Sequence, residues 1–171
     1  KPEATAAAID RDGWFHTGDA GYLKDSHLYL TERIKDLFKT SNGKYISPQA
    51  LETKLAIDRY IDQIAVIADE RKFVSALIVP VYGFVKDYAK EKGIAYSNMD
   101  ELLQHSKIQA LFRARIDTLQ QQFAHYEQVK RFTLLTEPFS MERGELTNTL
   151  KLKRSVVAKN YKGLIDKMYE E

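Results

Sequence analysis

Hydrophobic and polar positions follow two periodicities along this chain, one typical of strands and one typical of helices. Strand-like runs come first, at 20–24, 27–31, 37–40, 44–46, 64–68 and 73–79. Apolar residues then recur at helical spacing across 84–91 and 107–124, with a short helix expected at 99–103. A strand at 129–135 and one or two helices across 155–169 follow. This order predicts a small α+β domain, with short hairpins and a central sheet flanked by helices.

The first strand pair is predicted to be a hairpin, because the polar dipeptide Asp25-Ser26 separates two short runs of strand-forming residues. Its apolar side is expected to carry Tyr22, Leu28 and Leu30. The runs at 64–68 and 73–79 are continuously apolar and are separated by four polar residues. They predict a second hairpin, in a sheet that is covered on both faces.

Capping and turn residues set further boundaries. Asn42-Gly43 is a strong tight-turn signal between the runs at 37–40 and 44–46. Ser47 can cap a helix and Pro48 suits its first position, so a helix is predicted from Pro48 to about Ile57. The longest predicted helix carries a stripe of apolar residues, which we interpret as core packing: Ile108, Leu111, Phe112, Ile116, Leu119 and Phe123.

Composition excludes several classes of protein. The 171 residues suit one ordinary domain and a little more, and the net charge of +2 argues against nucleic-acid binding. The chain has no cysteine, its four histidines are not closely paired, and no metal site is expected. No run is long enough to span a bilayer and no signal peptide is seen, so a cytoplasmic location is expected. The chain opens on Lys1 within polar sequence, and we expect it to be part of a longer polypeptide.

Four stretches hold more polar side chains than the packing of a core requires, and they lie at 17–19, 32–36, 40–44 and 146–154. Each also has a plain explanation. Thr-Gly-Asp sequences are common in turns, and runs of basic residues are usually solvated faces.

Taken in order, these stretches resemble the AMP-forming adenylating enzymes, which include acyl-CoA synthetases, aryl-CoA ligases and peptide-synthetase adenylation domains. The family pattern is an aromatic-x-TGD turn, a short hairpin, an R-x-K/D-D stretch, a glycine turn and a helix that begins near a proline. The chain presents these elements in the same order, at 14–19, 33–36, Gly43 and 47–52. A lysine shortly ahead of an arginine completes the pattern, and Lys151 and Arg154 match it.

The residues within these motifs are similar to those of the long-chain fatty acyl-CoA synthetase branch, notably at 34–37, 40–44 and 146–154. One position departs from the family pattern, since most members have glycine directly before the lysine and this chain has Leu150. The resemblance covers almost the whole chain. It implies that residues 1–34 are the tail end of a large N-terminal AMP-binding domain and that residues 35–171 are a small C-terminal lid domain.

The resemblance also implies residue roles. Asp19 would bind the ribose hydroxyls of AMP, because a carboxylate can accept two hydrogen bonds at once. Arg33 would join it near the ribose with its planar fork of donors. The simpler explanation of Arg33 is a surface ion pair with Glu32 or Asp36.

Three further roles follow from the resemblance. Lys35 falls at the hinge about which the small domain turns. Gly43 would flank the CoA pantetheine channel, where the absence of a side chain lets a narrow ligand pass. Lys151 would be the catalytic lysine of adenylation, neutralising charge that builds at the α-phosphate of ATP. Its simpler explanation is a basic surface cluster with Lys153 and Arg154.

The implied enzyme activates a fatty acid with ATP-Mg²⁺ and transfers it to CoA, with the Mg²⁺ ligands outside this chain. Its partners would be these small molecules and its own N-terminal domain, with no nucleic acid. The isolated fragment is expected to be inactive and to bind nucleotide weakly or not at all. Peripheral contact at the inner membrane face is left open. Two alternatives remain: a medium-chain, aryl-CoA or peptide-synthetase adenylating enzyme, and a non-catalytic module that binds anions or membranes.

Overall fold

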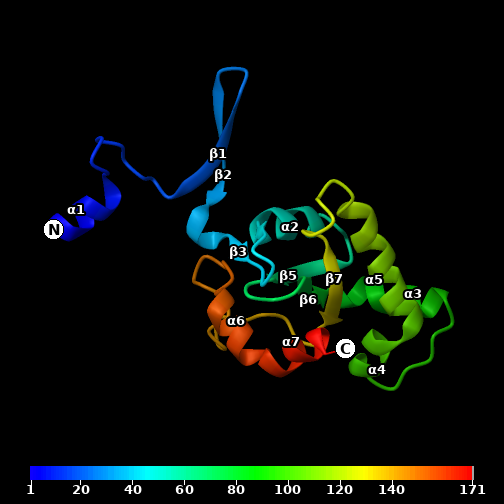
Figure 1. The fold of residues 1–171 in the computed structure, drawn as a ribbon. Helices are drawn as coiled ribbons and strands as arrows, with labels where there is room; N and C mark the ends of the chain where they lie inside the picture. The colour runs from blue at the N-terminus through cyan, green and yellow to red at the C-terminus, as the bar shows by residue number, and fades with distance from the viewer. Residues whose placement is uncertain (171) are drawn as a thin grey trace.

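A computed structural model describes residues 1–170, apart from the side chain of Glu32. Figure 1 shows a mixed α and β body from which the N-terminal segment projects. The elements run in this order: α1 (Pro2–Ala8), β1 (Asp19–Lys24), β2 (His27–Arg33), η1 (Ile34–Asp36), β3 (Phe38–Lys39), β4 (Tyr45–Ile46), α2 (Pro48–Leu55), β5 (Ile61–Ile67), β6 (Val74–Pro80), α3 (Tyr82–Glu91), α4 (Met99–Gln104), α5 (Ser106–Leu119), β7 (Val129–Leu134), α6 (Arg154–Asn160) and α7 (Lys162–Tyr169). The α+β class, with hairpins and a flanked central sheet, is confirmed.

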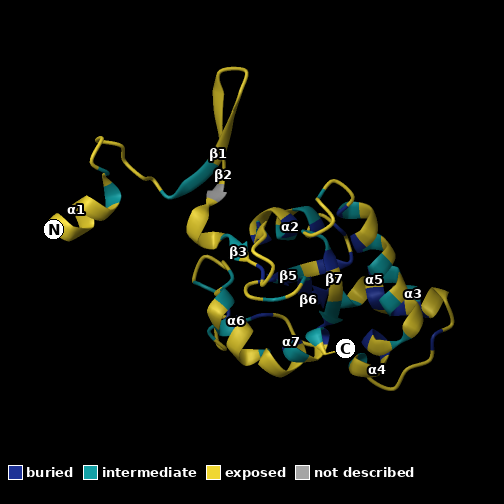
Figure 2. Ribbon diagram, in the orientation of Figure 1, coloured by how far each residue is buried: buried dark blue, intermediate teal, exposed yellow. Residues whose placement is uncertain are grey.

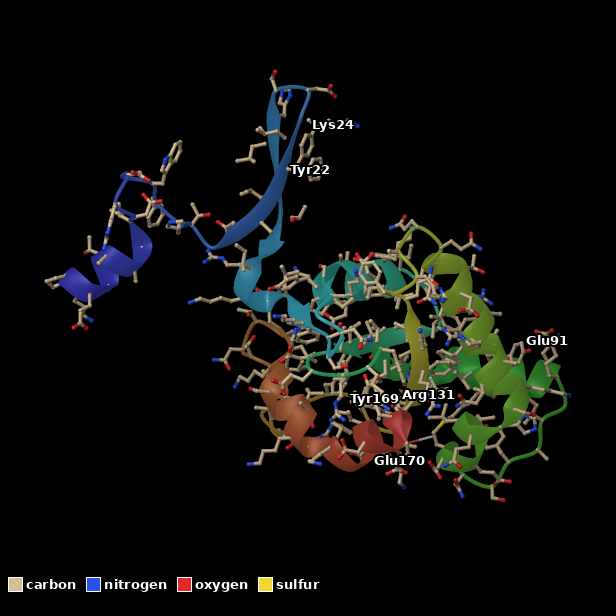
Figure 3. The ribbon with its side chains drawn as sticks, viewed as in Figure 1. Tyr22, Lys24, Glu91, Arg131, Tyr169 and Glu170 are labelled. Atoms are coloured by element: carbon tan, nitrogen blue, oxygen red, sulfur yellow. The ribbon has the colours of Figure 1, made fainter. Side chains whose placement is uncertain are left out.

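Hairpin β1–β2 stands away from the body, and most of its residues are exposed (Figure 2). A two-residue turn pairs Lys24 with His27, and this register places Tyr22 opposite Tyr29, where the two rings stack with their centroids 5.1 Å apart. Side chains alternate between faces along a strand, so Leu28 lies on the face opposite to these rings. The prediction that Tyr22 shares an apolar side with Leu28 and Leu30 is therefore wrong. Tyr22 and Lys24 are labelled on the hairpin in Figure 3.

The central sheet has the order β5-β6-β7, with β5 antiparallel and β7 parallel to β6. All seven residues of β6 are buried. Ala76 and Ile78 belong to a core cluster on one face of the sheet, whereas Leu77 and Val79 belong to a second cluster on the other face. The prediction of a sheet covered on both faces is confirmed.

Helices α2, α3, α4 and α5 cover the first face, and α3 to α5 form the crossover that makes β7 parallel to β6. The apolar stripe of α5 packs into this core, as predicted, with Ile108, Phe112 and Ile116 fully buried. The predicted extension of α5 to Ala124 is wrong, because the helix ends at Leu119. Directly after it, the buried amide of Gln120 turns to β7 and accepts a hydrogen bond from the Val129 N–H at 2.8 Å.

Helices α6 and α7 cover the second face, and their apolar contacts are Val157, Ile165 and Met168. Figure 3 shows how the chain end is held near β7. Arg131 donates from Nη1 to the carbonyls of Met168 and Glu170, at 2.9 and 2.6 Å. The C-terminal residues thus lie against the same sheet that organises the other helices.

Candidate functional site

Asp19 and Arg33 meet at the base of hairpin β1–β2, where they are paired residues. Arg33 Nε lies 3.0 Å from Asp19 Oδ1, and the Asp19 side chain is only 26% exposed. The Asp19 N–H donates to Thr17 Oγ1 at 3.1 Å, while Gly18, with a φ of +76°, accepts from the Ile34 N–H at 2.8 Å. The Thr-Gly-Asp turn therefore fixes this carboxylate beside the arginine and beside the start of η1.

The ion pair at Arg33 differs from the simpler one expected from the sequence. Arg33 contacts Asp19 across the hairpin, and Asp36 forms no ion pair with it in the described part of the chain. The other expected partner, Glu32, has a side chain that lies outside the described residues. Asp19 Oδ2 makes no hydrogen bond to a described residue, so the pair still offers an acceptor to a ligand.

Lys35 lies in the single 3₁₀ turn η1, between the hairpin and the body. Extended residues flank this turn on both sides, with Arg33 at φ −82°, ψ 133° and Leu37 at φ −71°, ψ 134°. The turn is closed by a weak hydrogen bond of 3.3 Å from the Leu37 N–H to the Ile34 carbonyl. A short segment of this kind can change its backbone angles without disturbing a packed core.

Lys151 lies in a closed loop between Leu146 and Leu152, which form an isolated antiparallel bridge. Its backbone is held on both sides by Thr147, whose Oγ1 accepts the Lys151 N–H at 3.0 Å and whose N–H donates to the Lys151 carbonyl at 2.8 Å. Leu150 has a φ of +59°, in the left-handed region that favours glycine. This position is the one at which the chain departs from the family pattern.

One cleft of about 620 Å³ brings the hinge candidate and the lysine loop together. Lys35 and Lys151 both line it and are exposed, and neither ammonium group forms an ion pair with a described residue. Glu52 and Arg154 also line this cleft and pair with each other. Two free cations in one open cleft can hold a polyanion such as a phosphate chain.

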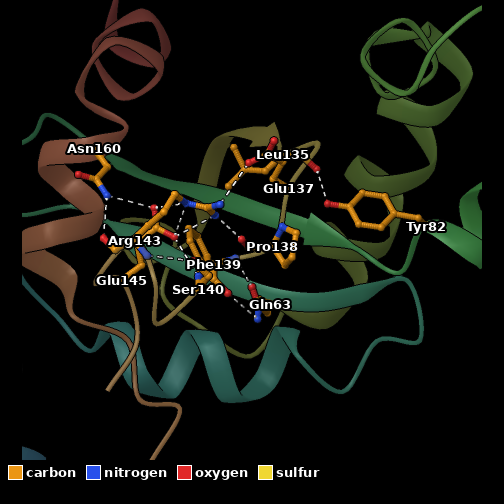
Figure 4. A network of polar contacts seen from close by, with 10 residues as sticks. All are labelled: Gln63, Tyr82, Leu135, Glu137, Pro138, Phe139, Ser140, Arg143, Glu145 and Asn160. Atoms are coloured by element: carbon orange, nitrogen blue, oxygen red, sulfur yellow. Dashed lines mark hydrogen bonds and ion pairs between the residues drawn. The ribbon is translucent and has the colours of Figure 1, made fainter. Parts of the chain in front are cut away.

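The loop that leads to Lys151 rests on a buried polar network, drawn in Figure 4. The Glu145 carboxylate, whose side chain is 1% exposed, accepts from Arg143 Nε, from the Ser140 N–H and from Asn160 Nδ2 at 3.0–3.1 Å. Burial alone would raise the pKa of Glu145, but these hydrogen bonds outweigh it and hold the pKa below its usual value of 4.5. The Glu145 carbonyl then accepts the Lys153 N–H at 2.7 Å, which joins the network to the lysine loop.

Gly43 lies in the turn between β3 and β4, with a φ of +74°, and its N–H donates to the Thr40 carbonyl at 2.8 Å. This confirms the predicted tight turn. The turn is tied to the β5–β6 connection, since the Ser41 N–H donates to the Arg71 carbonyl at 3.0 Å. Gly43 is not among the residues that line the cleft of Lys35 and Lys151. The structure therefore separates this candidate from the other two.

Glu52 and Glu145 were missed as site residues by reasoning from the sequence. Glu52 entered only as the end of a motif and Glu145 not at all. A signal existed for Glu52, because it follows Leu51 on a helix whose apolar face was expected to be buried, where a carboxylate needs a partner. Within the described residues, no group of three His, Asp or Glu side chains is placed to hold a metal ion, so we assign no Mg²⁺ ligand.

Comparison with protein families decides the relationship. Residues 35–171 match the model of a family described as the AMP-binding enzyme C-terminal domain. The chain belongs to this family. The resemblance seen in the sequence motifs is thereby confirmed.

Curated proteins with similar sequences include long-chain acyl-CoA synthetases. Peroxisomal long chain acyl-CoA synthetase 7 of Arabidopsis thaliana is 35% identical over 173 residues, and long-chain-fatty-acid–CoA ligase 5 of Rattus norvegicus is 36% identical over 176 residues. Each alignment covers 99% of this chain and 25% of the relative. The chain thus spans about a quarter of the length of these curated relatives.

Two solved adenylation domains share the fold of this chain. The adenylation domain of a carboxylate reductase from Mycobacterium chelonae has a TM-score of 0.76 and 25% identity, covering 99% of this chain and 25% of that one. The corresponding domain from Segniliparus rugosus, in complex with AMP and a co-purified carboxylic acid, has a TM-score of 0.75 and 23% identity, covering 98% of this chain and 25% of that one.

Across residues 1–170, every helix is too short or too polar to span a bilayer.

Proposed function

We propose that the chain is the C-terminal portion of an ATP-dependent, AMP-forming long-chain fatty acid-CoA ligase. The fatty acid carboxylate attacks the α-phosphorus of ATP, which gives acyl-adenylate and releases pyrophosphate. The CoA thiol then attacks the acyl carbon, which gives acyl-CoA and releases AMP. Residues 1–34 would end the large domain and residues 35–171 would form the small one, and the family match to 35–171 supports this boundary.

The observation that carries the proposal is the cleft shared by Lys35 and Lys151. In the proposed enzyme the unpaired ammonium of Lys151 enters the active site and neutralises charge that develops at the α-phosphate. Lys35 lies in the turn that joins the projecting hairpin to the body, which suits a pivot between the two half-reactions. The backbone of Lys151 lies in a loop that is closed by Thr147 and by the bridge between Leu146 and Leu152.

The remaining site residues fit the same enzyme. Asp19 offers its second carboxylate oxygen to the ribose of AMP, with Arg33 beside it. Gly43 projects no side chain, and no heavy atom lies within 4 Å of where a Cβ would be, so a narrow pantetheine arm could pass there. The ligands of the Mg²⁺ that accompanies ATP would come from the large domain.

The proposal is tested in the full-length enzyme with Lys151→Ala, and with Lys153→Ala as a matched control from the same loop. Pyrophosphate release from fatty acid and ATP measures the first half-reaction, and thioester formation from pre-made acyl-adenylate and CoA measures the second. We expect Lys151→Ala to slow the first about a hundredfold or more and to spare the second. Lys153→Ala should change neither. Equal rates for Lys151→Ala and wild type in the first half-reaction would refute the proposal.

The same assay separates the alternative functions. Varying the acid from aryl to medium-chain to long-chain substrates identifies the acyl group, and we expect long chains because the relatives at 34–36% identity are named for them. A non-catalytic module that binds anions or membranes would instead show salt-sensitive binding to anionic vesicles without pyrophosphate release. The engagement of Arg154 by Glu52 removes one cation from the basic cluster that such a module would need.

We expect the enzyme to act in the cytoplasm, with any contact at the inner membrane face being peripheral. Two plant relatives are named as peroxisomal, so cell fractionation is the deciding measurement. Enzyme found in a sealed organelle fraction would overturn the cytoplasmic assignment.

A further inference from the structure

The Glu52 carboxylate on α2 receives donors from two different elements. Arg154 contacts it as a fork, with Nη1 at 2.5 Å from Oε1 and Nη2 at 2.6 Å from Oε2. The N–H of Val66 on strand β5 donates to the same Oε1 at 2.8 Å. The side chains of Glu52 and Arg154 are 15% and 28% exposed, so the pair is largely shielded from solvent. Charge-assisted, two-pronged contacts of this kind fix both distance and orientation.

This pair joins the lysine loop to the rest of the fold. Arg154 is the first residue of α6 and follows Lys151 by three positions, so its anchoring sets where the loop ends. The Arg154 guanidinium also lies over the ring of Phe38, 5.5 Å from its centroid, and Phe38 follows η1 closely. Glu52, Arg154 and Phe38 line the same cleft as Lys151. One carboxylate thereby connects α2, the edge of β5, the lysine loop and the segment after the hinge candidate.

We propose that Glu52 is a positioning residue for Lys151 in adenylation and that it acts through Arg154. The inference rests on the proposed function, because it needs Lys151 to be the adenylation lysine. Lys151 is exposed, a strained residue precedes it in the loop, and among the described residues its hydrogen bonds are made with Thr147 alone. A catalytic charge must be held in place before the transition state forms, and small displacements from that geometry cost large factors in rate.

The chemistry of the pair defines the informative substitutions. Glu52→Gln keeps the size of the side chain but removes the charge and replaces one acceptor oxygen with a donor nitrogen that faces the guanidinium. Arg154→Lys keeps the charge but cannot bind as a fork. Asp58 offers a matched control away from the cleft. Its 5% exposed carboxylate accepts from Arg115 Nε at 2.7 Å and from the Tyr60 N–H at 2.9 Å, which repeats the partners of Glu52.

The first experiment compares both half-reactions in the full-length enzyme for Glu52→Gln, Arg154→Lys and Asp58→Asn. We expect Glu52→Gln and Arg154→Lys to lower kcat for pyrophosphate release about ten- to a hundredfold, with little change in the KM for ATP. Thioester formation from pre-made acyl-adenylate should stay within about twofold of wild type. Asp58→Asn should lower the Tm without changing the ratio of the two half-reactions. An equal loss in both half-reactions for Glu52→Gln, or no loss, would overturn the inference.

A double-mutant cycle with Lys151 separates positioning from general stability. If Glu52 acts only by placing Lys151, Glu52→Gln should have no further effect on adenylation in a Lys151→Ala background. Multiplying effects would overturn the inference while leaving the proposed function intact. If Lys151→Ala alone leaves adenylation unchanged, the proposed function itself fails, and the inference fails with it. Lys151→Ala alone therefore tests the proposed function, and the double variant tests the positioning role of Glu52.

Discussion

Thr147 and Lys151 form a closed ring of two hydrogen bonds that sets the backbone of the lysine loop. The threonine hydroxyl oxygen accepts the Lys151 N–H at 3.0 Å, and the Thr147 N–H donates to the Lys151 carbonyl at 2.8 Å. A second contact of 3.0 Å joins the hydroxyls of Thr147 and Thr149. The residue proposed to be catalytic is thus held by a side chain four positions earlier.

We expect Thr147→Ala to slow adenylation about fivefold, because one hydrogen bond of about 1 kcal/mol that orders the loop is lost. Thr147→Ser keeps the hydroxyl and should retain most of the rate. Pyrophosphate release in the full-length enzyme is the measurement. Equal losses in the serine and alanine variants would mean that the methyl group, not the hydroxyl, supports the loop.

Leu150 gives a prediction about stability, because it adopts a φ of +59° directly before Lys151 and is 67% exposed. A side chain in this region costs about 1–2 kcal/mol, whereas glycine adopts it readily. We therefore expect Leu150→Gly to be more stable than Leu150→Ala, by up to about 1 kcal/mol once the greater flexibility of unfolded glycine is counted. Urea unfolding of the two variants measures this. If the alanine variant is as stable or more stable, the loop does not keep this conformation in solution.

Most elements of the fold could be predicted from short sequence signals such as helix caps and turn residues. Ser47 does cap α2, accepting the Ala50 N–H at 3.2 Å, and Asn42-Gly43 does form a tight turn, because both signals depend on neighbouring residues only. The face of Tyr22 was predicted wrongly although the turn was predicted correctly, because a two-residue turn at Asp25-Ser26 pairs Lys24 with His27 and so sets Tyr22 opposite Tyr29. The end of α5 depends on Gln120 reaching Val129 on another element.

In the candidate site, too, residues in local motifs were predicted and a long-range pair was not. Lys35 and Lys151 were named from motifs, and the structure brings them to one cleft. Glu52 and Arg154 are far apart in the sequence, and nothing local to either indicates that they form a pair. Long-range pairs of this kind follow from how α2 and α6 pack around β5, which no periodicity in the sequence specifies.

Glu145 predicts a stability that depends on acid pH. Its folded-state pKa lies below 4.5, so its contribution to stability is present above that value and is lost as the pH falls through the folded-state pKa. We expect Glu145→Gln to be less stable than wild type by about 2–3 kcal/mol at pH 7, because hydrogen bonds to a buried charge are weakened. The difference should begin to narrow once the pH falls below 4.5, where the unfolded chain takes up a proton at Glu145 before the folded protein does.

Urea unfolding at pH 7 and at acid pH measures both differences, and exposed Glu142→Gln is the control for removing a carboxylate nearby. Glu142→Gln should change stability little at either pH. A gap between wild type and Glu145→Gln that stays constant with pH would show that Glu145 acts through shape and not through its charge.

Tyr82 predicts the opposite dependence, at alkaline pH. Burial, with Asp62 and Glu137 nearby, raises its pKa from 10.0 to about 12, and its hydroxyl donates to the Leu135 carbonyl at 3.1 Å (Figure 4). A raised folded-state pKa contributes stability that is fully present below pH 10, the unfolded value, and is lost as the pH rises through 12. Wild type should therefore lose stability more steeply than Tyr82→Phe across this interval.

At pH 8 wild type should be more stable than Tyr82→Phe by about 1 kcal/mol, because the variant loses one hydrogen bond. At the alkaline end of the interval we expect Tyr82→Phe to be the more stable of the two. Urea unfolding at the two pH values tests this crossover, with the exposed Tyr96→Phe as a matched control. Absorbance of tyrosinate gives an independent reading, because Tyr82→Phe should remove the latest titrating component from a chain with ten tyrosines. Burial also raises the pKa of Tyr161 and of Tyr169, so a latest component that survives in Tyr82→Phe would belong to one of these and would contradict the assignment to Tyr82.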